Sequence, residues 1–201
     1  MTSSSKAKPV ALPRREVVAT LLKDRRDTLV VTGLGSPSYD VHAAGDQDAN
    51  YYLWGAMGGA ALVGLGLAQA QPQRRVLVIT GDGEQLMAFG SLATIAVARP
   101  NNLDIVVLDN EHYGETGMQQ SHTGLGIDLA KVAAVCGFAV ARTLTSMGDV
   151  ADLRSPPKGP ASGPRLFVIK IAADSPPRSL PSRDAVHIKN RLRAHLGFSA
   201  D

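Results

Sequence analysis

The stretch Val76-Leu-Val-Ile-Thr80, followed directly by Gly81-Asp82-Gly83-Glu84, decides how this sequence folds. A run of apolar and β-branched residues predicts a strand that is buried on both faces, as in parallel sheets. The glycines beside Asp82 allow a tight turn where the strand ends, so a carboxylate can project into the crevice at that edge of the sheet. The stretch therefore predicts a polar turn at the carboxyl end of a buried strand.

A second polar pair follows another apolar run further along the chain. Asp109-Asn110 comes 25 residues after Glu84 and directly after Ile105-Val-Val-Leu108. The segment from Glu84 to Ala98 has the composition of a crossover helix, whose free N–H groups would point at a bound phosphate. Carboxylate and amide oxygens are suitable Mg²⁺ ligands. A glycine-flanked Asp is also found in ordinary strand-to-helix turns, but this spacing favours a site for a cation and a diphosphate.

This pattern resembles the thiamine diphosphate-binding motif, in which Gly-Asp-Gly is followed about two dozen residues later by a pair ending in Asn. The resemblance implies that the Asp82 carboxylate, the Asn110 side chain and the main-chain carbonyl of His112 hold Mg²⁺. It also implies that Gly83 and Glu84 offer backbone N–H groups to the phosphates. The implied cofactor-binding residues around the diphosphate are Gly81, Asp82, Gly83, Glu84, Asn110, His112, Tyr113 and Gly114.

An upstream segment, Leu53-Trp-Gly-Ala-Met-Gly-Gly59, resembles the part of such enzymes that grips the cofactor rings. By that resemblance the Gly55 carbonyl accepts from the 4′-amino group and the Met57 N–H donates to a pyrimidine nitrogen. The Met57 side chain would hold the cofactor bent between its two rings. On composition alone, the favoured interpretation of Met57 is a core residue at the start of a Gly/Ala-rich helix, because small residues at helical spacing usually mark close packing.

The narrower likeness is to the cofactor-binding, beta-type subunit of sulfopyruvate decarboxylase and to the matching half of phosphonopyruvate decarboxylase. It rests on the motifs Gly33-Leu-Gly-Ser-Pro-Ser38, Asn50-Tyr-Tyr-Leu53 and Glu115-Thr-Gly-Met-Gln119, together with those above. Two departures stand out. Glu84 occupies a position that is usually small, so its side chain should turn away from the diphosphate. Glu111-His-Tyr-Gly114 replaces a glycine-rich sequence of the family, so the resemblance does not define the identity of the substrate.

Apolar strands alternating with helices predict an α/β fold with a mostly parallel sheet and helices on both faces. Residues 1–13 are expected to be a disordered tail, and residues 14–201 a single thiamine diphosphate-binding domain that ends in a basic helix over Asp184–Leu196. The expected strands are Leu29–Thr32, Val76–Thr80, Asp104–Asp109, Phe138–Arg142 and Leu166–Ile171. The remaining expected helices are Arg14–Arg26, Ala56–Ala70, one starting at Asp128, and Met147–Leu153; Ser155–Pro164 is expected to be a loop.

The resemblance also implies a shared active site. Enzymes of this kind need a glutamate against the cofactor pyrimidine, and that residue belongs to a different domain. Glu84, Glu111 and Glu115 all follow strand ends on the diphosphate side, so a pyrimidine-type (PYR-type) partner subunit is expected to supply it, in a hetero-oligomer that decarboxylates a 2-oxoacid. His112, Glu115 and His122 are the candidate catalytic residues. Tyr113 and Gln119 on the same loop are further candidates for proton donation or substrate contact.

Three alternatives stay open. A carboligase of acetolactate-synthase type would join two carbonyl compounds rather than release an aldehyde. A non-catalytic subunit would bind the cofactor without turnover. A nucleotide-binding Rossmann domain is disfavoured because no Gly-x-Gly-x-x-Gly follows Val31 or Thr80.

Composition and charge disfavour membrane-spanning, secreted and nucleic-acid-binding proteins. The chain has no apolar run suited to a bilayer and no apolar leader after Met1, and its lone Cys136, expected to be a buried inert thiol, fits a reducing cytoplasm. The formal charge of +3 comes from the flanks, since residues 1–27 carry seven Lys and Arg against three acids. A basic surface over the site is not expected, which disfavours nucleic acid. A site for an acidic group of the substrate is expected to lie on the partner.

Overall fold

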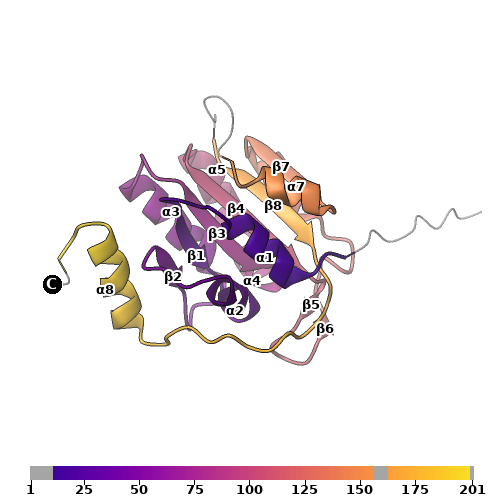
Figure 1. Ribbon diagram of the computed structural model, residues 1–201. Helices are drawn as coiled ribbons and strands as arrows, with labels where there is room; N and C mark the ends of the chain where they lie inside the picture. Colours follow the sequence, from indigo (N-terminus) through magenta and orange to yellow (C-terminus); the bar gives the residue numbers. More distant parts are fainter. Residues whose placement is uncertain (1–10, 156–162, 200–201) are drawn as a thin grey trace, which may run out of the picture.

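The computed structural model describes residues 11–155 and 163–199, and these contain a six-stranded sheet in the order β2-β1-β3-β4-β8-β7 (Figure 1). Every neighbouring pair in this sheet is parallel. The predicted α/β class with a mostly parallel sheet is confirmed. The strands are β1 (Leu29–Thr32), β2 (Asn50–Tyr52), β3 (Val76–Gly81), β4 (Leu103–Asp109), β7 (Val140–Leu144) and β8 (Arg165–Lys170).

The central strands are those with the longest apolar runs. All seven residues of β4 are buried, as are the first five of β3. Val78 pairs with Ile105 and Thr80 with Val107, so the ends of β3 and β4 lie next to each other. This register brings the turn after Gly81 beside the turn after Asp109, as the spacing of the two motifs predicts.

Helices cover both faces of the sheet and bury two apolar cores. One core contains side chains of α3, α5 and α6, and the other contains side chains of α1, α2 and α7. The helices are α1 (Arg14–Leu22), α2 (Ser36–Ala43), α3 (Ala60–Ala70), α4 (Asp82–Met87), α5 (Ser91–Ala98), α6 (Leu129–Cys136), α7 (Met147–Asp152) and α8 (Ala185–His195). Figure 1 shows α1 crossing one face of the sheet, with α2 below it.

The strand order changes direction between β1 and β3. The chain passes from β1 outward to β2, and then returns to place β3 on the other side of β1. The connections that follow β1 and β3 therefore leave on different sides, which opens a crevice at the carboxyl ends of these two strands. The residues after Thr32 and those after Gly81 meet at this crevice.

Several elements differ from the sequence expectation. The expected helix from Glu84 to Ala98 is two helices, since α4 ends at Met87 and α5 begins at Ser91, after Gly90. The helix expected from Ala56 begins at Ala60, because Gly58 has a φ of 92° that a right-handed helix does not accept. The expected irregular loop before Gly126 contains a small antiparallel pair, β5 (His112–Tyr113) with β6 (Gln119–Gln120). Both α2 and β2 were missed.

The ends of the chain also correct the expectation. Leu12 is buried, and it bridges to Ile171 in parallel fashion, so defined structure begins before residue 14. Residues 1–10 of the expected tail, and 156–162 of the expected loop, lie outside the described residues.

The basic C-terminal helix is present and packs beside β2, at the edge of the sheet (Figure 1). The Arg191 guanidinium donates to Asp46 Oδ2 at 2.6 Å and to the Asn50 carbonyl at 3.2 Å, which ties α8 to this edge. None of the helices in the described part of the chain is long and apolar enough to cross a bilayer.

Candidate functional site

A cavity of about 160 Å³ lies at the carboxyl ends of β1, β3 and β4. It is lined by residues from the turns after these strands, from the start of α1 and from the segment after Asn110. Ten of the residues proposed from sequence reach it, which are Met57, Gly81, Asp82, Gly83, Glu84, Asn110, His112, Tyr113, Gly114 and Glu115. The register of β3 and β4 therefore brings together residues that are distant in sequence.

Asp82 is the buried acid of this cavity. It is 2% exposed; its Oδ2 accepts a hydrogen bond from the Ser121 hydroxyl and lies 3.1 Å from the Thr123 hydroxyl oxygen. Burial raises the pKa of the Asp82 carboxyl, the nearby charge of Asp109 raises it further, and the hydroxyl donors oppose the shift. A nearby cation would therefore stabilise the charged carboxylate.

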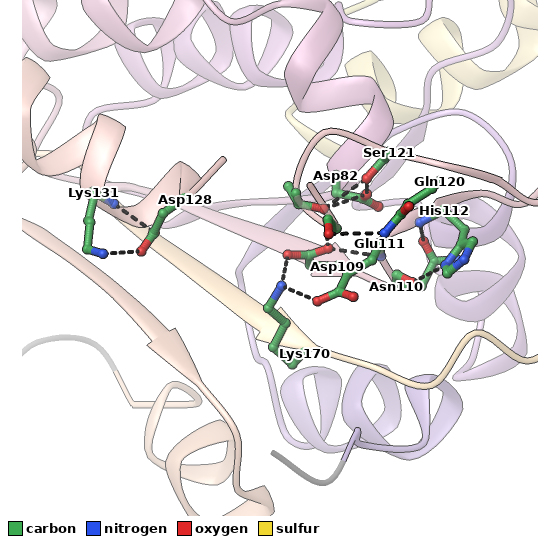
Figure 2. A network of polar contacts seen from close by, with 12 residues as sticks. Asp82, Asp109, Asn110, Glu111, His112, Gln120, Ser121, Asp128, Lys131 and Lys170 are labelled. Atoms are coloured by element: carbon green, nitrogen blue, oxygen red, sulfur yellow. Dashed lines mark hydrogen bonds and ion pairs between the residues drawn. The ribbon is translucent and has the colours of Figure 1, made fainter. Parts of the chain in front are cut away.

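Asn110 and His112 line the cavity at the end of β4. The Asn110 Oδ1 accepts from the His112 amide at 3.0 Å, and His112 Nδ1 lies 2.8 Å from the Asn110 carbonyl (Figure 2). A carbonyl oxygen only accepts, so Nδ1 carries the proton in this contact and Nε2 is the ring nitrogen with a lone pair. His112 can therefore exchange a proton through Nε2.

The absence of a side chain at Gly83 leaves room for the Tyr113 ring. A Cβ built on Gly83 would lie 2.5 Å from the Tyr113 ring, whereas one built on Gly81 meets nothing within 4 Å. The Tyr113 ring thus packs directly on the backbone of the turn. The result is an open backbone surface at Gly81 and a closed one at Gly83.

The Glu84 side chain is buried, and backbone amides of two neighbouring segments donate to it. Its Oε2 accepts from the Leu34 amide at 2.9 Å, and its Oε1 accepts from the Gly58 amide at 3.3 Å. Burial raises the pKa of the Glu84 carboxyl, and its hydrogen bonds oppose the shift. The side chain joins the turn after β3 to the turn after β1 and to the loop before α3.

Behind Asp82, a chain of polar contacts reaches β8 (Figure 2). The Thr123 hydroxyl donates to Asp109 Oδ1 at 2.8 Å, and Lys170 Nζ lies 2.6 Å from Asp109 Oδ2 and 3.0 Å from Glu111 Oε1. Burial lowers the pKa of the Lys170 amine, but hydrogen bonds and attraction from Asp109 and Glu111 outweigh it and raise the pKa. Lys170 is therefore a cation that balances these two acids.

Two predicted site residues do not line this cavity. Gly55 is exposed and does not line the cavity; its φ of 72° makes it a turn residue. His122 is exposed as well, and it lines a second hollow with Leu86, Met87, Phe89, Tyr113 and Ile127. Glu115 lies at the cavity, but its carboxylate is paired with Arg178 at 3.0 Å.

Other cavity residues were missed from sequence. Arg14 is 5% exposed and lines the cavity, although its basic segment reads as a solvated flank. Its Nε lies 3.1 Å from Asp40 Oδ2, and Arg15 Nε lies 2.5 Å from Asp40 Oδ1, so two guanidinium groups share one carboxylate and leave one net positive charge. Leu34, Ser36 and Pro37 also line the cavity; they belong to the motif Gly33–Ser38, which supported the resemblance but carried no predicted site role. No local signal marks Arg14, Ser121, Thr123 or Lys170.

Comparison with known proteins identifies the family. The family described as "Thiamine pyrophosphate enzyme, C-terminal TPP binding domain" matches residues 37–156, more than half of the chain. The chain belongs to this thiamine pyrophosphate enzyme family. Thiamine pyrophosphate is another name for thiamine diphosphate, so the family expected from the sequence is confirmed. The matched residues include both strand-end turns of the cavity.

Several curated proteins that are similar in sequence to this chain are named decarboxylases. The chain is 43% identical over 131 residues to sulfopyruvate decarboxylase subunit beta of Methanothermobacter thermautotrophicus, covering 65% of this chain and 70% of that one. It is 43% identical over 127 residues to phosphonopyruvate decarboxylase of Streptomyces viridochromogenes, covering 63% of this chain and 32% of that one. The matching beta subunit of Methanocaldococcus jannaschii is 42% identical over 110 residues, 55% of this chain and 58% of that one. The chain thus spans only a third to three fifths of two of these relatives.

Solved structures share the fold at lower identity. A thiamin diphosphate-dependent enzyme from Mycobacterium smegmatis superposes with a TM-score of 0.67 at 20% identity, covering 86% of this chain and 34% of that one. Benzoylformate decarboxylase from Polynucleobacter necessarius superposes with a TM-score of 0.65 at 19% identity, covering 88% of this chain and 36% of that one. Both are likenesses of fold alone.

Proposed function

We propose that this chain is the thiamine diphosphate- and Mg²⁺-binding subunit of a 2-oxoacid decarboxylase, active with a PYR-type partner subunit. The observation that carries the proposal is the meeting of Asp82 and Asn110 at one cavity, from the ends of two adjacent parallel strands. A diphosphate with its Mg²⁺ is the ligand that this arrangement suits in a thiamine pyrophosphate enzyme.

The residues present fit the cation. The donors are one carboxylate, one amide oxygen and main-chain oxygens, which are the hard ligands that Mg²⁺ prefers. Asp82 and Asn110 would each contribute a side-chain oxygen, and His112 its main-chain carbonyl. Among the described residues no cluster of three or more His, Cys, Asp and Glu side chains is arranged to hold a metal, so the amide and the main chain would have to complete this set.

The residues also fit the diphosphate. Nothing within 4 Å occupies the Cβ direction of Gly81, so a phosphate can approach this backbone closely. Arg14 adds a positive charge to the same wall. Met57 is 39% exposed at the cavity, an unusual exposure for a large apolar side chain, and would support the cofactor rings.

The cofactor, when bound, supplies the electron sink that makes loss of CO₂ from a 2-oxoacid possible. This chain's residues hold and orient the reactants. Through Nε2, His112 can take up or deliver a proton at the cavity wall. Its Nδ1–H is held by the Asn110 carbonyl, which fixes the ring.

We propose that the activating glutamate comes from the partner. The three nearby candidates of this chain already have other contacts, since Glu84 accepts two backbone amides, Glu111 contacts Lys170 and Glu115 contacts Arg178. The name "subunit beta" of the archaeal relatives agrees with a second kind of chain.

For the substrate we propose a small 2-oxoacid with a further acidic group, like sulfopyruvate or phosphonopyruvate. The support is the names of the relatives at 42–43% identity. The carboligase alternative predicts an acyloin instead of an aldehyde.

The test is to purify the chain alone and with the product of the neighbouring reading frame. Each preparation is given Mg²⁺, thiamine diphosphate and a panel of 2-oxoacids, and both CO₂ and organic products are measured. We expect an aldehyde and CO₂ from the pair and negligible turnover from the lone chain. Robust turnover by the lone chain would refute the shared site, and an acyloin product would refute simple decarboxylation.

A further inference from the structure

Two buried hydroxyls connect the acids that end β3 and β4. Ser121 is 0% exposed and Thr123 is 7% exposed, and their hydroxyl oxygens are 2.8 Å apart. Both lie within hydrogen-bond distance of Asp82 Oδ2, and the Thr123 hydroxyl donates to Asp109 Oδ1 at 2.8 Å. Figure 2 shows Ser121 beside Asp82. This segment carries no family motif in the sequence analysis.

The contacts restrict how the Asp82 carboxylate can rotate. Because both hydroxyls meet the same oxygen, Oδ2 is directed toward Ser121 and Thr123. The other oxygen, Oδ1, then points away from this pair, since the two oxygens of a carboxylate diverge from one carbon. The pair therefore selects one orientation of the acid at the cavity.

Asp109 links this orientation to the second proposed ligand. Its Oδ1 accepts both the Thr123 hydroxyl and, at 3.0 Å, the Glu111 amide. The second contact spans Asn110, so it fixes the backbone turn that carries the Asn110 side chain. Thr123 thus lies between the two strand ends that supply the ligands.

Lys170 makes the arrangement electrostatically possible. Asp82 and Asp109 are each 2% exposed and share the Thr123 hydroxyl as a neighbour, so their charges repel each other in a poorly solvated place. Lys170 Nζ, on the far side of Asp109, supplies the compensating charge at 2.6 Å.

We propose that Ser121, Thr123, Asp109 and Lys170 form a positioning network that orients Asp82 and the Asn110 turn for the divalent cation. The inference rests on the proposed function, because the cation is the one that would accompany the diphosphate. These residues do not touch the cation; they act through its ligands, as outer-shell partners do in other metal sites.

The test uses Thr123→Val, which keeps the shape of the side chain and removes the hydroxyl, and Thr123→Ser, which restores it. The full chain is studied in complex with its partner, and Mg²⁺ is titrated by calorimetry at saturating thiamine diphosphate. We expect Thr123→Val to weaken Mg²⁺ binding by about 10- to 100-fold, as loss of an outer-shell contact does in other metal sites. Thr123→Ser should bind within about threefold of the wild type, since it keeps the hydrogen bond.

Thr28→Val is the matched control, because Thr28 is another buried threonine but lies before β1, at the opposite end of the sheet. It should leave Mg²⁺ affinity unchanged. A folded Thr123→Val protein that binds Mg²⁺ as tightly as the wild type would overturn the positioning network. If Thr123→Val does not fold, Mg²⁺ is titrated into Ser121→Ala instead, because this change removes only one oxygen. Wild-type Mg²⁺ affinity of the folded Ser121→Ala protein would then overturn the positioning network. A wild-type complex that takes up no Mg²⁺ with the cofactor would overturn the proposed function itself.

Discussion

The Glu84 carboxylate fills the space beside Gly33, so that a Cβ built on Gly33 would lie 1.8 Å from Glu84 Oε2. The same oxygen accepts the Leu34 amide at 2.9 Å. The two residues follow β3 and β1, the strands on either side of the crevice. A large acid after the glycine-flanked Asp and a glycine after β1 thus form one complementary contact.

Gly33→Ala should destabilise the protein, because the new methyl group would displace the Glu84 carboxylate from its backbone donors. Overpacking of this kind costs about 1–3 kcal/mol. Thermal unfolding with and without cofactor would measure the loss. Gly66→Ala is the control: it lies in α3 with open space around the Cβ direction, and should be neutral or stabilising by up to about 1 kcal/mol. In the Glu84→Ala background, Gly33→Ala should cost less than in the wild type; equal costs would contradict the contact.

His112→Ala should lower turnover while leaving cofactor affinity nearly unchanged. The side chain is lost, but the main-chain carbonyl proposed as a Mg²⁺ ligand remains. Loss of a general acid or base typically lowers the rate by about 10²–10⁴-fold. Steady-state rates and calorimetric cofactor binding separate the two effects. His187→Ala on the exposed side of α8 serves as the control, and an unchanged rate for His112→Ala would remove this residue from the mechanism.

Asp104→Asn should destabilise the fold without affecting the cavity. Asp104 is 3% exposed at the opposite end of β4, and it accepts from Arg165 Nε and Nη2 at 2.6 Å and from Arg75 Nε at 2.7 Å. Removing the charge leaves two guanidinium groups without their acid, at a cost of about 3 kcal/mol. Chemical denaturation would measure it. Cofactor affinity of the folded variant should match the wild type, and a large loss would show that the two ends of β4 are coupled.

The ion pair between Arg191 of α8 and Asp46, which lies before β2, should stabilise the protein in a pH-dependent way. Burial raises the pKa of the Asp46 carboxyl, but hydrogen bonds from Arg191 and Tyr52 outweigh it and hold the pKa below its usual value. A lowered folded-state pKa gives stability that is present above the unfolded pKa of about 3.9 and is lost as the pH falls through the folded value. The difference in melting temperature between wild type and Asp46→Asn should therefore be larger at pH 7 than at pH 3. A difference that grows on acidification would contradict this assignment.

The sequence predicted the central part of the fold because its signals are local. The apolar runs that form β3 and β4 mark strands buried on both faces, and the turns after them mark the site. In contrast, β2 was missed because Asn50–Tyr52 is short and polar at its first residue, and its burial depends on contacts with β1, Arg25 and α8. The break between α4 and α5 at Gly90 was hidden in a sequence of good helix formers.

The site residues that were missed share one physical reason. Thr123 reaches Asp82 across 41 positions, and Lys170 reaches Asp109 across 61. A threonine in a polar loop and a lysine at the end of a strand have no pattern that distinguishes them from solvated side chains. Arg14 is similar, since only the packing of α1 brings it to the cavity. Conversely, Gly55, expected at the site from the resemblance, and His122, expected there from its place on the loop after Asn110, do not line the cavity.

The central claim is that the Asp82 carboxylate anchors the cation that binds the diphosphate. It is tested most directly by calorimetric titration of thiamine diphosphate into the complex of this chain with its partner, with Mg²⁺ present and with Mg²⁺ removed by chelation. Asp27→Ala, an exposed acid in a turn, is the control. The account predicts Mg²⁺-dependent uptake by the wild type and by Asp27→Ala, and loss of that uptake in Asp82→Ala. Undiminished uptake by Asp82→Ala, or uptake by the wild type that ignores Mg²⁺, would contradict it.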